Sequence, residues 1–325
     1  MEFLKAITAR EALDMIDAFP VSLHTEVVSI DESLGRIVAE DIVAHENIPP
    51  FSRSLVDGYA VKVKDAQGAK ETSPALLFYK GEIRIGEETK AILEDGSCIY
   101  ISTGAMMPEG ADGVVMQEHT RRMGDAIEIT KTIHKGENII FTGEDIKLGS
   151  IVLKQGKRLA PFDLGVLAAL GIADVWSYKK LRIAIISSGD EIISVDKRPA
   201  PGQIRDINRY TILNMLKKTC SDVEFVGITR DNPEDIQEHL LAARESDIIL
   251  VSGGSSKGER DYITTSIEQL GGTILFHGVN IKPGKPTIFA SLWGKPVFGL
   301  PGHPVSCIMA LTRFVIPLVK KLQGE

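Results

Sequence analysis

The sequence predicts a multidomain protein in which a β-rich region precedes an open α/β domain. Short β-branched runs separated by glycine, proline and aspartate turns fill residues 27–132. From about residue 178 onward, strand-like and helix-like segments alternate. A chain of 325 residues with 43% hydrophobic residues is also long enough to bury more than one core.

The first half begins with a predicted helix that ends near Pro20. Thr8 and Glu11 have the spacing of a capping box, and an apolar pattern of 3.6-residue period follows them. In the β-rich region, strands are expected at residues 60–63, 76–79, 97–101, 113–118 and 126–130. A second helix is expected between Pro161 and Gly171, because proline favours a helix start and glycine follows a helix end. We place a domain boundary there.

The second half alternates between the two periodicities. Strands are expected at residues 181–187, 223–229 and 247–251, with further strands before the last helix. Helices are expected at residues 208–219, 232–245, 261–270 and 304–322. Internal repeats and low-complexity tracts are both absent from the sequence.

Composition narrows the classes of function. The formal charge of −7 argues against a nucleic-acid surface, because phosphate backbones are bound by clustered lysine and arginine. No apolar run reaches about 18 residues, and the N-terminus lacks a signal-peptide core, so we expect a cytoplasmic protein that does not enter a membrane. Cys98, Cys220 and Cys307 are far apart and are expected to be buried, reduced thiols.

A glycine-rich loop at residues 252–261 lies between an apolar strand and a helix. This arrangement presents backbone amides to a phosphate at the carboxyl edge of an α/β sheet. The loop matches neither a Walker A sequence nor a dinucleotide fingerprint. A tight turn that needs glycine for its dihedral angles is the alternative interpretation.

Two further loops are expected at the same edge. Residues 282–286 carry two lysines on a backbone stiffened by two prolines, which suits an anion, although a surface turn is the alternative. Residues 300–304 end a strand and open the last helix. Because three such loops share one sheet edge, we predict a common binding crevice.

A fourth loop, residues 187–191, adds carboxylates beside this crevice. Asp190 and Glu191 could hold Mg²⁺, which bridges phosphate oxygens to one or two carboxylates. Helix capping is the alternative role for either acid.

These loops resemble those of the molybdopterin molybdenumtransferase family, whose eukaryotic relatives include the E domain of gephyrin. The C-terminal blocks are S-G-G-x-S-x-G-E-x-D-Y at residues 252–262, K-P-G-K-P at 282–286 and L-P-G-x-P-V-S at 300–306. The N-terminal blocks are P-x-F-x-x-S-x-x-D-G-Y-A-V at residues 49–61, T-G-A-x-x-P-x-G-A-D at 103–112 and G-E-D at 143–145. Together the blocks cover essentially the whole chain in the family's order.

The resemblance implies a multidomain fold of α/β and β domains. An elongated, discontinuous linker domain (residues 1–45 and 135–172) would carry an inserted β-rich domain (46–134), followed by a three-layer α/β molybdopterin-binding domain (173–325). It also implies a homodimer with active sites shared between subunits. Family members usually continue with a small C-terminal β-domain, for which we expect no counterpart here.

The implied reaction inserts molybdate into adenylylated molybdopterin and releases AMP, with Mg²⁺ as cofactor. The implied catalytic residues are Asp57, Thr103, Asp145 and Asp261, and the implied metal ligands are Asp190, Glu191, Asp57 and Asp261. Substrate binding would fall to Ser252, Gly253, Gly254, Ser255, Gly258, Lys282, Gly284 and Lys285, and molybdate binding to Pro301, Gly302, His303 and Ser306. A molybdopterin adenylyltransferase and molybdoenzyme delivery proteins are the partners that fit this reaction.

The chain departs from the family pattern at two motifs. His303 replaces the usual asparagine of L-P-G-N-P, either as a hydrogen-bond donor to an oxyanion or as a helix-cap substitution. Residues 53–59 replace the usual N-S-A-M-D-G-Y. Two other functions remain open. The chain could be a molybdopterin adenylyltransferase, although those enzymes lack the N-terminal half that this chain has, or it could be a non-catalytic pterin-binding or scaffolding protein.

Overall fold

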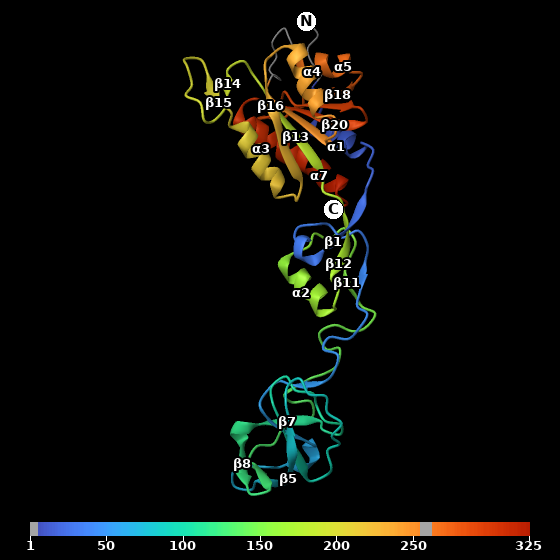
Figure 1. The fold of residues 1–325 in the computed structure, drawn as a ribbon, viewed down its shortest axis with the longest axis vertical. Coiled ribbons are helices and arrows are strands. Elements are labelled where there is room, and N and C mark those ends of the chain that lie inside the picture. Colours follow the sequence, from blue (N-terminus) through green and yellow to red (C-terminus); the bar gives the residue numbers. More distant parts are fainter. Residues whose placement is uncertain (1–5, 254–261) are drawn as a thin grey trace. The chain divides into compact units, whose positions relative to one another are not determined.

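The computed structural model describes residues 6–253 and 262–325. Contacts within the chain divide it into two compact units (Figure 1). The first, here called the α/β unit, comprises Met1–Glu40, Gln155–Leu164 and Ala173–Glu325, and the second, the β unit, comprises Asp41–Lys154 and Gly165–Ile172. The finer division into three domains, with boundaries after residues 45, 134 and 172, stays a prediction.

A six-stranded sheet organises the α/β unit in the order β16-β13-β17-β20-β19-β18. Its strands are β13 (Arg182–Ser188), β16 (Asp222–Thr229), β17 (Ile248–Ser252), β18 (Thr273–His277), β19 (Ile288–Leu292) and β20 (Lys295–Leu300). The first four strands in this order are parallel, whereas β19 and β18 are antiparallel to their neighbours. The carboxyl ends of the parallel strands therefore meet at one edge, as predicted.

Helices cover both faces of this sheet and make three layers (Figure 1). They are α1 (Ala9–Asp17), α3 (Asn208–Lys217), α4 (Pro233–Ala242), α5 (Tyr262–Gln269), α6 (Pro304–Ala310) and α7 (Ile316–Leu322). Apolar residues of α1, α3, α6 and α7 share one buried cluster with the sheet, and those of α4 and α5 share another. The predicted three-layer α/β arrangement is therefore confirmed.

The predicted N-terminal starts of α1 and α4 are also confirmed. The amide of Glu11 donates to the Thr8 Oγ1 at 3.2 Å, and the Glu11 carboxylate accepts from the Thr8 amide at 2.7 Å. Asn232 caps α4 by accepting from the Asp235 amide at 2.9 Å. These side chains satisfy amides that lack a partner within the first helical turn.

The last helix differs from its prediction as one continuous α-helix. A π-helical segment at Leu311–Val315 separates α6 from α7. Pro317 explains the interruption, because its ring lacks an N–H for the carbonyl of Arg313 and clashes with that carbonyl in a regular α-helix.

Short strand pairs that the sequence did not predict complete the α/β unit. The antiparallel strands β1 (Thr25–Ser29) and β12 (Asp174–Tyr178) pair along their full length. A parallel pair, β14 (Ile192–Ile193) and β15 (Ile204–Arg205), lies between β13 and α3 in the chain.

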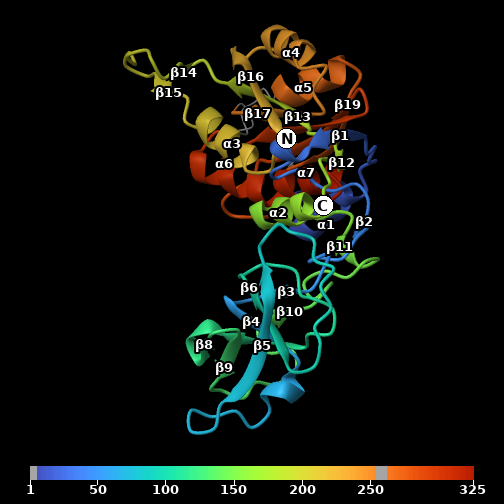
Figure 2. The same cartoon turned by 60° about the horizontal axis from the view of Figure 1, so that its bottom comes forward.

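The β unit is built on a second six-stranded sheet, in the order β7-β4-β6-β5-β9-β8. Figure 2 shows strands β4, β5, β6, β8 and β9 of this sheet. Its strands are β4 (Gly58–Val61), β5 (Ala75–Ile83), β6 (Ser97–Ile101), β7 (Gly113–Met116), β8 (Thr120–Met123) and β9 (Ala126–Ile129). Alternate residues enter two apolar clusters, so that Ala60 joins one and Val61 the other. The five predicted strands are present, whereas β8 was not predicted.

Smaller elements connect this sheet to the rest of the β unit. Strand β2 (Ile42–Val43) pairs with β11 (Ile151–Leu153), and β3 (Arg53–Ser54) pairs with β10 (Ile139–Ile140). Helix α2 (Pro161–Ala169), of which Gly165–Ala169 belong to the β unit, begins with proline and is followed by Gly171, as expected. Throughout residues 6–253 and 262–325, each helix is too short or too polar to cross a bilayer.

The three cysteines are free, as predicted, but the prediction that all three are buried is wrong for Cys220, which is half-buried. Cys98 and Cys307 are buried, and desolvation raises the pKa of each thiol to about 12.

The aromatic core of the α/β unit gives a stability prediction. Phe289 is fully buried and its ring centroid lies 4.7 Å from that of Phe298 and 5.5 Å from that of Phe276. Phe289→Ala should lower the free energy of unfolding by about 3–5 kcal/mol, through lost burial and the cavity left behind. Urea unfolding followed by tryptophan fluorescence would measure this, because Trp176 and Trp293 both lie in this unit.

Phe162→Ala is the matched control, because 89% of the Phe162 side chain is exposed. We expect it to change stability by no more than about 0.5 kcal/mol. Equal effects of the two substitutions would contradict this assignment of the core.

Candidate functional site

A hollow of about 1030 Å³ opens at the carboxyl edge of the sheet in the α/β unit. Its walls include residues from the ends of β13, β17 and β20 and from the loops that follow them. They include Ser187, Ser188, Glu191, Ser252, Gly253, Pro286, Pro301, Gly302, His303, Pro304 and Ser306. The hollow thus brings together the ends of β17 and β20 with Pro286 of the lysine loop, while Gly254, Ser255, Gly258 and Asp261 lie outside the described residues.

Gly253 brings the neighbouring strand ends together. Its φ is +106°, and a Cβ at this position would lie 2.0 Å from the carbonyl oxygen of Ser188. Its amide donates to the carbonyl of Leu300 at 3.0 Å. Only glycine combines this backbone conformation with so close an approach of another main chain.

The lysine loop contributes less to the wall than the sequence suggested. Pro286 lines the hollow, whereas Lys282, Gly284 and Lys285 do not belong to its lining. Both lysines are exposed, and the turn between them is held by the Thr287 hydroxyl, which donates to the Gly284 carbonyl at 2.7 Å. The ammonium groups are thus free to reach a ligand from solvent.

Of the two acids predicted to bind Mg²⁺ in the fourth loop, only one lines the hollow. Glu191 lines the hollow, whereas Asp190 does not, and the Asp190 carboxylate accepts the amide of Asp231 at 3.3 Å. Asp231, which sequence reasoning missed, lies on the wall and accepts the Ser188 hydroxyl at 2.7 Å. A polar residue after a strand is the only signal that could have found it.

These carboxylates limit how Mg²⁺ could bind. Among residues 6–253 and 262–325, no group of three or more His, Cys, Asp and Glu side chains could hold a metal. Mg²⁺ commonly uses one or two carboxylates together with substrate phosphates and water. Glu191 and Asp231 fit that mode, and they do not fit a site made by protein ligands alone.

The turn before α3 was also missed by sequence reasoning. Asp206 is 5% exposed, and its carboxylate accepts the Ser187 hydroxyl at 2.6 Å and the Arg209 amide at 3.0 Å. Asn208 is 8% exposed and donates to Ser252 and Gly302. Short polar residues before an apolar helix give a capping signal, but that signal does not reveal contacts to distant loops.

The N-terminal motif blocks meet in the β unit. The Asp57 carboxylate accepts the amide of Thr103 at 2.7 Å and its hydroxyl at 3.0 Å. The Ser52 Oγ accepts the amide of Thr142 at 3.2 Å, which joins the first block to the chain just before G-E-D. Asp145 is held through its amide, which donates to the Ile48 carbonyl at 3.0 Å, and its side chain is exposed.

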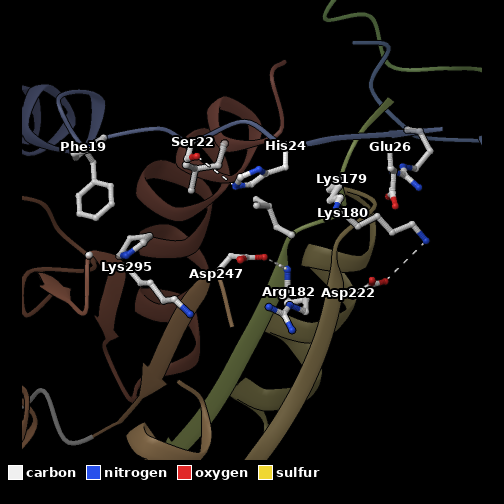
Figure 3. Close-up of a pocket in the computed structure, with 16 residues that line it drawn as sticks. Phe19, Ser22, His24, Glu26, Lys179, Lys180, Arg182, Asp222, Asp247 and Lys295 are labelled. Atoms are coloured by element: carbon white, nitrogen blue, oxygen red, sulfur yellow. Dashed lines mark hydrogen bonds and ion pairs between the residues drawn. The ribbon is translucent and has the colours of Figure 1, made fainter. Parts of the chain in front are cut away.

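A second hollow, of about 770 Å³, lies at the amino ends of the strands and is lined by charged side chains (Figure 3). The Lys180 Nζ lies 3.9 Å from the Asp222 Oδ1, and the Asp247 carboxylate accepts the backbone amide of Arg182 at 2.8 Å. None of the residues that the sequence assigns to a site lines this hollow. The carboxyl edge is therefore the better candidate site.

Comparison with known proteins agrees with this architecture. Residues 7–171 match a family described as the MoeA N-terminal region (domain I and II), and residues 184–321 match a probable molybdopterin binding domain. The chain is 38% identical to a molybdopterin molybdenumtransferase of Haemophilus influenzae, over 96% of this chain and 76% of that protein. A molybdopterin molybdenumtransferase of a Nostoc species is 33% identical, over 98% and 74%.

Solved structures give the same result. Two crystal structures of the molybdopterin biosynthesis moeA protein from Pyrococcus horikoshii are 39% and 35% identical, with TM-scores of 0.84 and 0.83. Each covers 98% of this chain, which spans 81% and 80% of those chains. The predicted mixed α/β and β multidomain fold is confirmed, and the chain belongs to the molybdopterin molybdenumtransferase family.

Proposed function

We propose that this chain is an enzyme of molybdenum cofactor biosynthesis that inserts molybdate into adenylylated molybdopterin and releases AMP. One observation carries the proposal: the hollow joins the three predicted loops, in a chain 38% identical to a molybdopterin molybdenumtransferase over 96% of its length. The substrate is polyanionic, and glycine-rich loops at strand ends supply backbone donors to such groups.

The phosphates are assigned to the loop that begins at Ser252 and Gly253, together with Gly254, Ser255 and Gly258 beyond the described segment. Lys282 and Lys285 supply positive charge from the loop whose turn centres on Gly284. Their exposure supports this role, because a solvated ammonium group can approach an anion without first breaking a buried contact.

Molybdate is assigned to Pro301, Gly302, His303 and Ser306. His303 is the N-cap residue of α6 and is exposed, yet its side chain makes no capping hydrogen bond. This supports the oxyanion role over the capping alternative, because the imidazole faces solvent and is able to donate to a tetrahedral dianion.

The acidic residues are assigned to catalysis and to Mg²⁺. Asp57, Thr103, Asp145 and Asp261 are the proposed catalytic positions, and Asp57, Glu191 and Asp261 the proposed metal ligands, together with Asp231 on the wall of the hollow. Asp190, which does not line the hollow, is left out of this set. Bound Mg²⁺ would neutralise charge on the phosphate oxygens. Thr103 orients the Asp57 carboxylate through two hydrogen bonds, which supports a fixed role for that acid.

The proposal extends to a cytoplasmic homodimer. A molybdopterin adenylyltransferase would supply its substrate, and molybdoenzyme delivery proteins would accept its product. The deciding test is molybdate-dependent AMP release from adenylylated molybdopterin by the purified chain. Binding without AMP release would favour a scaffold, and synthesis of the adenylylated compound from ATP would favour an adenylyltransferase.

The first prediction of this assignment concerns Asp57. Asp57→Asn should leave the fold intact and reduce AMP release by about 100-fold or more, because the carboxylate charge is lost while its shape remains. Circular dichroism and the AMP assay would measure the two effects. Asp125→Asn, an exposed acid of the same unit, is the control. Full activity of Asp57→Asn would remove Asp57 from the site.

A second prediction concerns the lysine loop. Lys282→Ala or Lys285→Ala should weaken molybdopterin binding about 10- to 100-fold, because a charge-assisted contact is lost in a chain of net charge −7. Thermal stability should hardly change, since both lysines are exposed. Calorimetric titration would decide, with exposed Lys217→Ala as control. Unaltered affinity in both variants would mean that the loop is only a turn.

A third prediction concerns the shared active site. Inactive Asp57→Asn and Asp261→Asn chains, mixed and allowed to exchange subunits, should recover part of the wild-type activity, because some hybrid sites would contain both intact acids. Sedimentation of the mixture would report the dimer. A fully active monomer at micromolar concentration would refute the proposal.

A further inference from the structure

Asn208, the first residue of α3, joins two of the loops around the hollow. Its Nδ2 donates to the Ser252 Oγ at 2.9 Å and to the Gly302 carbonyl at 2.8 Å. A primary amide carries two N–H donors, so the protein uses both of them. Asn208 therefore acts on the loops rather than donating to a substrate.

The two loops need such a connection because the strand ladder stops at their base. Pairing between β17 and β20 extends to Ser252 and Leu300, and the Gly253 amide adds one more bond to Leu300. The side-chain amide of Asn208 then binds the carbonyl of Gly302, which lies beyond the end of β20. Ser252 and Gly302 thereby share one fixed donor.

The donor itself is held rigidly. Ile212 and Leu216 of α3 are fully buried against the sheet. Asp206 anchors the preceding turn through the Ser187 hydroxyl at 2.6 Å. The Asn208 side chain therefore loses little conformational entropy when a ligand binds, because its amide group is already in place before binding.

We propose that Asn208 is a positioning residue that sets the separation of Ser252 and Gly253, where β17 ends, from the loop after β20. The proposal rests on the proposed function, in which the loop that begins at Ser252 binds the substrate phosphates and the loop after β20 binds molybdate. The reaction between the two bound groups depends on that separation, whereas the binding of either group to its own loop does not. Small errors in such a separation are costly to a reaction between two bound groups.

The decisive variant is Asn208→Leu. Leucine has the same number and branching of side-chain heavy atoms as asparagine, but it has no donor and adds no charge. Asn214→Leu is the matched control, because Asn214 lies on the same helix, is exposed, and donates only to the Tyr210 carbonyl at 2.7 Å among the contacts described.

Steady-state kinetics should separate positioning from general damage. For Asn208→Leu we expect kcat to fall about tenfold, because the two bound reactants are no longer aligned, while the KM for adenylylated molybdopterin and the KM for molybdate each stay within about twofold. Asn214→Leu should match the wild type. A wild-type kcat, or a rise of either KM beyond about twofold, would overturn the proposal.

Amide hydrogen exchange tests the same proposal without relying on activity. Asn208→Leu should speed exchange in peptides that contain Ser252–Gly253 and Leu300–Gly302, and leave β13 and β16 unchanged. If the wild-type chain released no AMP, the proposed function would fail while this measurement still decided the role of Asn208. Unchanged exchange in both peptides, or faster exchange throughout the sheet, would exclude a positioning role.

Discussion

The site depends on the parallel pairing of β13, β17 and β20. These strands are apolar and buried on both faces, since helices cover each face of the sheet. Parallel pairing places their carboxyl ends at one edge, so the loops that leave them become neighbours. The close approach of Gly253 to Ser188 follows from this pairing, and a larger residue there would force the strand ends apart.

The charges around the hollow oppose the binding of an anion. The chain carries a formal charge of −7, and Glu191, Asp206 and Asp231 line the hollow that is proposed to take an anion. Hydroxyls of Ser187 and Ser188 donate to two of these acids and spread their charge. The remaining repulsion is a physical reason for including Mg²⁺ in the proposed function, because a divalent cation lowers the cost of bringing phosphates beside carboxylates.

The sequence predicted more of the fold than of the site. Capping residues such as Thr8 and Asn232 fixed helix starts, because their effect is local and reaches only three residues along the chain. Strands β1, β12, β14 and β15 were missed, since they are short or partly exposed and show no clear apolar alternation. The motif blocks assigned Asp57 and Thr103, which are 46 residues apart, to the same site. Only the fold shows that their side chains are in contact.

By itself, the sequence determined the family, the order of the longer strands and helices, and two of the loops at the hollow, which follow β17 and β20. Their glycines and prolines restrict local dihedral angles, and that restriction is written in neighbouring residues. The tertiary structure decided that Asn208 joins Ser252 and Gly302, and that Asp231 and Glu191, not Asp190, line the wall. The two Asn208 contacts link residues that are 44 and 94 positions apart in the sequence. Such residues come within hydrogen-bond distance only because of the order in which the strands pair.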